Sequence, residues 1–174
     1  MNKKNIILQA ALELFAKEGF NATSTRKVAL RANVSEGLIF RHFKNKNGLL
    51  EAILSEGEEK AKLLYADIVF DPEPQNVIVK TIDLGRKFMD SLEISDFWKL
   101  QYKIKWEVEH YNQTKMEPLE LALANAFAKL NYDKPKEEAQ FLLIYLDGLA
   151  TRYFLQKEFD AEKAIQFLHQ KYKQ

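Results

Sequence analysis

The side chains that could do chemistry gather between residues 25 and 46, where cationic groups recur at short intervals. Lys and Arg side chains bind phosphate oxygens, and Arg can also bind the acceptor edge of guanine. Any one of these groups would be an ordinary solvated side chain, but together they indicate a contact with nucleic acid. The group comprises Arg26, Lys27, Arg31, Arg41, His42, Lys44 and Lys46.

Two short helices with a tight turn between them must position these cations. Apolar residues recur at helical spacing over 25–32 and again over 35–42, which predicts one buried face on each helix. Asn33 and Val34 turn the chain, and the Ser35 hydroxyl can cap the second helix. Two small helices that cross steeply and share a core form a helix-turn-helix.

This stretch resembles the DNA-binding signature of the tetracycline-repressor-like (TetR) family of bacterial transcriptional regulators. Residues 7–15 with Gly19-Phe20 are similar to the first helix of that family. Two positions depart from the family pattern: Asn33 stands where glycine is usual, and Phe40 stands where tyrosine is usual. Asparagine tolerates the positive φ that the turn requires, whereas Phe40 lacks the hydroxyl that typically reaches a DNA phosphate. The matching motif residues are Thr25-Arg26-Lys27, Val28-Ala29, Asn33-Val34-Ser35, Gly37, His42-Phe43, Lys46 and Leu49-Leu50.

The resemblance implies a role for each candidate residue. Arg26 matches a position that can reach a base edge or a phosphate, and the groove-facing candidates of the second motif helix are Glu36, Gly37, Leu38 and Arg41. Phosphate contacts, which hold register without reading sequence, are expected from Thr25, Ser35, His42, Lys44 and Lys46. The full predicted DNA-binding set is Thr25, Arg26, Lys27, Ser35, Glu36, Gly37, Leu38, Phe40, Arg41, His42, Lys44 and Lys46.

The sequence pattern also predicts helices for the rest of the chain. Gly and Pro are scarce, at six and four residues, and no segment alternates as a strand would. Gly19 should end the first helix, and 71–74, with two prolines, should interrupt a long one. We therefore predict an all-α fold, with an N-terminal helix-turn-helix domain (1–46) and a C-terminal effector-binding and dimerisation bundle (47–174). The expected helices are 4–18, 25–32, 35–42, 45–69, 76–92, 95–112, 115–131, 135–157 and 161–172.

Composition narrows the classes of function. The absence of cysteine excludes disulfides, thiol nucleophiles and zinc–thiolate sites. No apolar run approaches membrane-spanning length and no signal peptide is recognisable, so we expect a cytoplasmic protein. The net charge of +1 is the sum of a basic N-terminal region and an acidic remainder. Residues 1–50 hold nine Lys/Arg and three Asp/Glu, a net charge of +6. The rest of the chain holds 17 Lys/Arg and 22 Asp/Glu, a net charge of −5. A basic N-terminal region suits a polyanionic partner.

The last two predicted helices suggest self-association. Residues 139–154 are apolar nearly all round, so one face can pack on the chain's own core and another on a second copy. The alternative is a central helix wrapped entirely by its own chain. A homodimer is favoured because major-groove readers commonly pair to span two half-sites. The candidate interface residues are Leu142, Leu146, Leu149, Tyr153, Ile165 and Leu168.

Aromatic residues are frequent in the middle helices. On pattern alone such residues are more often core, but the resemblance implies an effector pocket here, with a small hydrophobic or aromatic ligand as the expected partner. The candidate pocket residues are Phe88, Trp98, Tyr102, Trp106, Phe127 and Tyr145.

The function predicted from the sequence is a ligand-responsive repressor that binds double-stranded DNA at an inverted-repeat operator as a homodimer. The alternative is an effector-independent DNA-binding module whose C-terminal bundle serves dimerisation or protein contacts. An enzyme is disfavoured: Glu107 and His110 have the spacing of a di-iron motif, but the second such motif is missing, and phosphate loops and nucleophile elbows are also missing. No cofactor or metal is expected.

Overall fold

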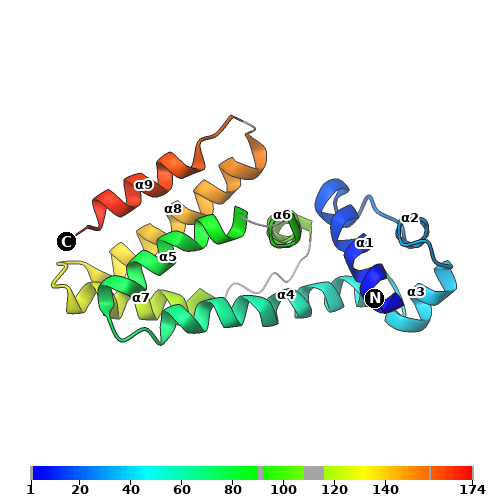
Figure 1. Ribbon diagram of the computed structural model, residues 1–174, viewed down its shortest axis with the longest axis horizontal. Coiled ribbons are helices and arrows are strands. Elements are labelled where there is room, and N and C mark those ends of the chain that lie inside the picture. Colours follow the sequence, from blue (N-terminus) through cyan, green and yellow to red (C-terminus); the bar gives the residue numbers. More distant parts are fainter. Residues whose placement is uncertain (1, 90–91, 108–115, 157, 174) are drawn as a thin grey trace. The chain divides into compact units, whose positions relative to one another are not determined.

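The computed structural model describes residues 2–89, 92–107, 116–156 and 158–173, without the side chains at 64, 88, 89, 92–94, 105 and 106. Within these ranges the chain forms nine α-helices and no strand (Figure 1), which confirms the predicted all-α class with helix ends shifted by a few residues. The helices are α1 (Lys3–Glu18), α2 (Thr25–Arg31), α3 (Glu36–Phe43), α4 (Lys46–Val69), α5 (Pro74–Met89), α6 (Leu92–Glu107), α7 (Glu117–Lys129), α8 (Pro135–Leu155) and α9 (Ala161–Lys171).

The chain divides into two compact units. Unit 1 comprises residues 1–61 and 92–111, and unit 2 comprises 62–91 and 112–174. The predicted boundary between residues 46 and 47 separates a DNA-binding domain from an effector-binding and dimerisation domain. Packing does not test this division by function, and it stays a prediction. In the packing itself, α6 and the first part of α4 belong with the three N-terminal helices.

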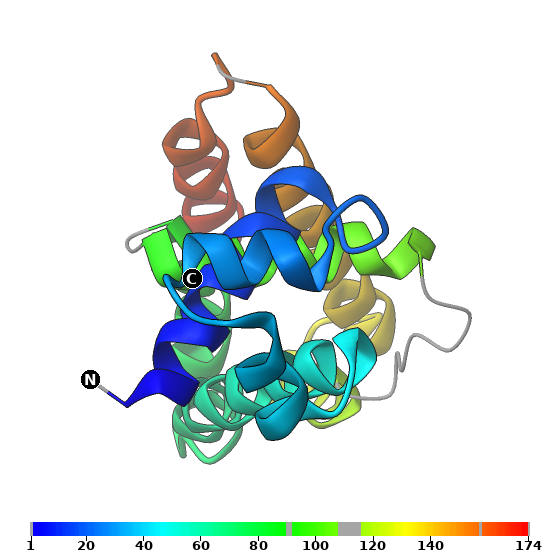
Figure 2. The same ribbon diagram turned by 90° about the vertical axis from the view of Figure 1, so that its right-hand side faces the viewer.

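Unit 1 is built around the apolar face of α1, which packs against α2 and α6 (Figure 2). Val28 from α2 and Ile39 from α3 are both fully buried in this core. The α6 residues Leu100 and Ile104 are buried in the same cluster. A helix remote in sequence therefore completes the hydrophobic core of the helix-turn-helix.

Backbone conformation confirms two of the predicted turns. Asn33 has a φ of 51° between α2 and α3, the left-handed conformation that asparagine tolerates better than most residues. Gly19 has a φ of 97° and ends α1, with its N–H donating to the carbonyl oxygen of Phe15 at 2.9 Å. These two residues set the directions in which the chain enters α2 and α3.

Unit 2 is a bundle of α5, α7, α8 and α9 with the last part of α4. Its core includes the fully buried Phe127, whose ring lies 4.9 Å from Tyr132 and 5.2 Å from Tyr172. Arg86 on α5 donates from Nε to Glu162 on α9 at 2.8 Å, and this bond lowers the pKa of Glu162 to about 2. Apolar packing and an ion pair thus both join α9 to the bundle.

None of the helices in the described ranges has the length and apolar character needed to span a bilayer.

Candidate nucleic-acid interface

Helix α3 has one buried face and one exposed face. Ile39 and Phe43 are buried in the core of unit 1, and Leu38 is half-buried against it. On the opposite side Gly37, Phe40 and Arg41 are exposed, with Phe40 at 46%. Spacings of three and four residues place these side chains on the same face of the helix. The exposed face is the part of α3 that can enter a groove.

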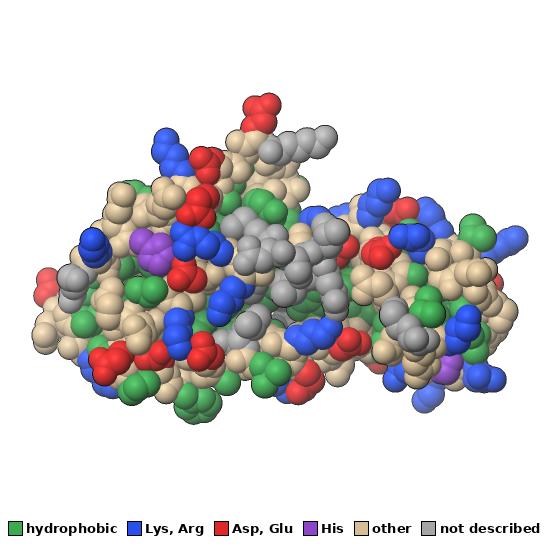
Figure 3. All heavy atoms as spheres, in the orientation of Figure 1, with side chains coloured by type: hydrophobic (Ala, Val, Ile, Leu, Met, Phe, Trp, Pro, Cys, Tyr) green, Lys and Arg blue, Asp and Glu red, His purple; other side chains and the backbone are tan. Residues whose placement is uncertain are grey.

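The predicted cations fall into two groups. Within the described residues the side chains of Arg26, Arg41 and Lys44 form no ion pair or hydrogen bond, and all three are exposed. By contrast, Lys27 pairs with Glu18, and Arg31 bonds Glu13 at 2.6 Å. The first group is available to an external anion, whereas the second is already neutralised by α1. Figure 3 shows Lys and Arg side chains gathering over the α1–α3 end of unit 1.

A side-chain bond joins α2 to α3. The Thr25 hydroxyl donates to Oε1 of Glu36 at 2.6 Å. This bond links the start of α2 to the first turn of α3. The groove contact of Glu36 and the phosphate contact of Thr25 stay predictions.

Serine residues precede both motif helices, with different consequences. The Ser24 hydroxyl accepts from the N–H of Lys27 at 3.2 Å and so caps α2. Ser35 is the N-cap residue of α3, but its side chain makes no capping hydrogen bond. The Ser35 hydroxyl is exposed and remains compatible with its predicted phosphate contact. Ser24 was missed in the sequence, although a serine just before a helix is a common cap.

The turn from α3 into α4 is tight. Lys44 has φ 64° and ψ −48°, and the N–H of Asn45 donates to the Phe43 carbonyl at 2.8 Å, which makes a γ-turn of the rare strained kind. The Asn45 side chain then accepts from the N–H of Gly48 at 2.8 Å. A Cβ on Gly48 would lie only 2.2 Å from the Phe43 oxygen. This turn holds the exposed Lys44 at the end of α3.

Lys46 lies elsewhere than the sequence analysis expected. Its ammonium group donates to the carbonyl oxygens of Phe20 at 2.9 Å and Thr23 at 3.1 Å. The same nitrogen lies 4.3 Å from the centre of the Phe20 ring, in a cation–π geometry. Lys46 thus holds the chain segment between α1 and α2, and its phosphate contact stays a prediction.

These contacts change what we expect from Lys46→Ala. The variant should unfold at a lower temperature, with a loss of about 1–3 kcal/mol for the vacated carbonyls and the cation–π contact. The salt dependence of DNA affinity should keep its slope, because no phosphate contact is removed. Differential scanning calorimetry and binding titrations at several salt concentrations measure both quantities. A slope shallower by about one unit with unchanged stability would restore Lys46 to the phosphate set.

Comparison with known proteins gives this geometry a context. Residues 7–53, which hold α1 to α3 and the start of α4, match the model of the family described as bacterial regulatory proteins, tetR family. The match covers 47 of the 174 residues, so the similarity to this family is established for the N-terminal segment. Over 50 residues it is 58% identical to an uncharacterized HTH-type transcriptional regulator, YvkB, of Bacillus subtilis, covering 29% of this chain and 26% of that protein.

A second relative extends the similarity beyond the motif. Over 94 residues the chain is 37% identical to an HTH-type transcriptional repressor of Mycobacterium tuberculosis, covering 51% of this chain and 47% of the relative. The matched stretches thus span less than half of the length of these curated relatives. Both relatives are named as transcription regulators.

Solved structures of tetR-family proteins agree with the fold over nearly the whole chain. A TetR-family regulator from Rhodococcus superposes with a TM-score of 0.71 at 20% identity, covering 98% of this chain and 96% of that one. A regulator from Saccharomonospora viridis, solved with choline, superposes with a TM-score of 0.76 at 19% identity, covering 96% and 93%. At this identity the likeness establishes the fold alone.

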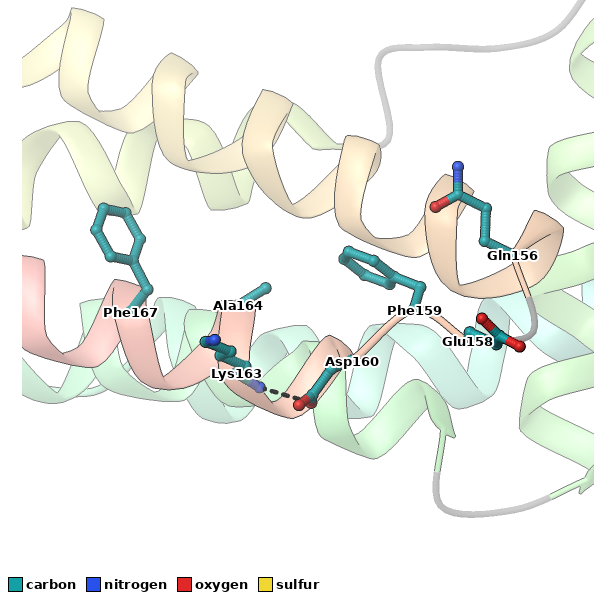
Figure 4. A pocket seen from close by; sticks show the side chains of 7 residues that line it. All are labelled: Gln156, Glu158, Phe159, Asp160, Lys163, Ala164 and Phe167. Atoms are coloured by element: carbon teal, nitrogen blue, oxygen red, sulfur yellow. Dashed lines mark hydrogen bonds between the residues drawn. The ribbon is translucent and has the colours of Figure 1, made fainter.

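The predicted pocket residues are divided between the two units, and their common pocket stays a prediction. Trp98 and Tyr102 lie on α6 in unit 1, where Trp98 packs against the core, while Phe127 and Tyr145 lie in unit 2. The side chains of Phe88 and Trp106 lie outside the described residues. Figure 4 shows a hollow at the α8–α9 turn, broadly open to solvent and containing none of the six. Its lining residues are Gln156, Glu158, Phe159, Asp160, Lys163, Ala164 and Phe167.

The predicted interface residues lie mostly in the chain's own core. Four of the six are buried, and Leu146 and Tyr153 are half-buried against the same cluster. The apolar side chains that α8 and α9 expose are neighbours that the sequence analysis left out of that set. The buried four are Leu142, Leu149, Ile165 and Leu168, and the exposed neighbours are Phe141, Ile144, Leu155 and Phe167.

Glu107, one half of the possible di-iron motif, makes a hydrogen bond to the backbone. Its Oε2 accepts from the backbone N–H of Asn21 at 3.1 Å. His110, the other half of the possible metal motif, lies outside the described residues. The carboxylate is therefore engaged with the backbone of the segment between α1 and α2.

Proposed function

We propose that the chain is a sequence-specific DNA-binding transcriptional regulator that uses α3 as its recognition helix. One observation carries the proposal: α3 buries Ile39 and Phe43, while its opposite face exposes Gly37 and Arg41 beside cations whose side chains have no partner among the described residues. An unpaired guanidinium on an exposed helix face is the group that reads guanine. The match of residues 7–53 to the model of the tetR family of regulatory proteins supports the same assignment.

Within this proposal the site residues take distinct roles. Arg41 and Arg26 are the base-edge candidates. Gly37 has no side chain to keep the backbone from the DNA, and the space beside it is open, with no atom within 4 Å of a Cβ built there. Ser35, His42 and Lys44 are the phosphate candidates. Phe40 offers its exposed ring edge without a hydroxyl, so it supplies apolar contact only.

We further propose that two copies bind an inverted-repeat operator. A helix-turn-helix reader commonly pairs to reach two half-sites about 34–36 Å apart. The support on this chain is the exposed apolar side chains of α8 and α9, with Ile144 at 71% exposure. Such residues favour association because burying them removes apolar surface from water.

The finer proposal is that a small hydrophobic or aromatic effector releases the DNA. Structural neighbours solved with triclosan and with choline support ligand binding by this fold. The effector must bind the DNA-incompetent state more tightly, because equal affinity shifts no equilibrium. The complete burial of Phe127 favours the alternative of an effector-independent module. Stabilisation of thermal unfolding by hydrophobic compounds would separate the two.

The test of the function is selection of the purified full chain against a randomised duplex library at moderate salt. Enrichment of an inverted repeat is the expected result, and it would supply the operator for later measurements. Weak binding that salt abolishes, with no sequence enriched, would contradict the proposal, because it would reduce the contact to nonspecific charge attraction.

A further inference from the structure

The loop between α1 and α2 connects the core of unit 1 to the first motif helix. This α1–α2 loop, residues 19–24, begins at the positive φ of Gly19 and ends at Ser24, which caps α2. Its interior is anchored by Thr23, a buried residue whose hydroxyl donates to the Gly19 carbonyl at 2.8 Å. Any shift of the loop therefore moves the start of α2, where Arg26 lies.

Helix α6 holds this loop through side-chain contacts with its backbone. Oε2 of Glu107 accepts from the Asn21 N–H at 3.1 Å, across 86 positions of sequence. One turn earlier on α6, the Lys103 ammonium donates to the Lys17 carbonyl in the last turn of α1, at 2.9 Å. Lys103 on α6 thus binds a carbonyl that the C-terminal end of α1 leaves without a helical partner, and Glu107 binds an N–H of the loop that follows.

The glycine at position 19 is part of the same arrangement. A Cβ built on Gly19 would lie 3.0 Å from Oε1 of Glu107, closer than carbon and oxygen comfortably approach. Glycine therefore serves both the backbone conformation and the close approach of the carboxylate. From the other side, the Lys46 ammonium donates to the Phe20 and Thr23 carbonyls. The loop is held from α6 and from α4 at once.

From these contacts we infer that Glu107 is a positioning residue for DNA recognition, acting through the α1–α2 loop with Lys103 beside it. This positioning role rests on the proposed DNA-binding function, and Glu107 lies outside the helix-turn-helix motif itself. Glu107 touches no part of the predicted DNA surface; it sets the position of Ser24 and hence of the Thr25–Arg26 end of α2. Helix α6 is then a working part of the DNA-reading unit.

The test compares Glu107→Ala and Glu107→Gln in the full chain. Both remove the charge, but only the alanine removes the oxygen that accepts from Asn21. The matched control is Glu117→Ala, which makes the same charge change at an exposed glutamate on α7. Amide hydrogen exchange at Asn21 and affinity for the selected duplex are measured for each protein, with circular dichroism to establish folding.

We expect Glu107→Ala to exchange faster at Asn21 and to bind the selected duplex about three- to tenfold more weakly, the range for one lost hydrogen bond. Glu107→Gln should restore most of both losses. Lys103→Met, which keeps the aliphatic stem, should weaken binding in the same direction. The inference is overturned if Glu107→Ala matches Glu117→Ala in affinity, whether or not exchange at Asn21 is faster.

Failure of the proposed function would look different. In that case the wild-type protein itself would enrich no duplex, before any variant is compared. A wild-type protein that selects a sequence, with a Glu107→Ala variant that binds it equally well, overturns the positioning role alone.

Discussion

Replacing Arg41 with alanine should abolish most of the preference at the base that it contacts while leaving the protein folded. Arg41 is exposed on the outward face of α3 and forms no bond with the described part of the chain, so its loss costs little stability. A bidentate arginine–guanine contact contributes about 1–3 kcal/mol of discrimination, which is about 5- to 150-fold in affinity for the correct base. The measurement is the ratio of affinities for the selected duplex and for single-base variants of it.

Lys44→Ala is the matched control for Arg41→Ala. Lys44 is an exposed cation at the end of the same helix, and a phosphate contact there would weaken all duplexes about equally. Its loss should also make the salt slope shallower by about one unit. If Arg41→Ala instead reproduces this uniform weakening, Arg41 belongs with the phosphate contacts. Unchanged affinity and specificity would remove it from the interface.

Ile39→Ala should strongly destabilise the protein, because Ile39 lies on the buried face of α3. Ile39 has 0% exposure in the core of unit 1, and truncating a buried isoleucine costs about 2–5 kcal/mol in transfer and cavity terms. A typical domain has a total stability of about 5–15 kcal/mol, so the helix-turn-helix would lose a large share of it. Urea denaturation of the full chain, followed by circular dichroism, measures the change in the free energy of unfolding.

The adjacent residue supplies the control for Ile39→Ala. Phe40 is 46% exposed, so Phe40→Ala should cost only about 1 kcal/mol or less, although it removes a larger side chain. Which of the two variants loses more free energy of unfolding shows which face of α3 points inward. A larger loss for Phe40→Ala would mean that the helix is rotated and that Arg41 cannot lie on the groove-facing side.

Local patterns in the sequence were enough to predict the helices and the motif. The apolar spacing that buries Val28 and Ile39, and the tolerance of Asn33 for a positive φ, depend on residues within one or two turns of one another. Gly19 at the end of α1 is of the same kind. Such features follow from side-chain size and backbone sterics, which a linear sequence contains in full.

The partners of polar side chains were decided by the tertiary structure. Sequence shows that Lys46 and Glu107 are charged, but the groups they meet lie 26 and 86 positions away and are backbone atoms that every residue carries. The pattern likewise could not separate the half of an apolar helix that fills its own core, such as Leu142, from the half left exposed, such as Ile144. The sequence by itself therefore determined the family motif, the helices and the cationic character of the surface. Only the three-dimensional packing determined which cations remain free and which glutamate holds the loop, because hydrogen bonding and burial depend on distances between segments that periodicity does not encode.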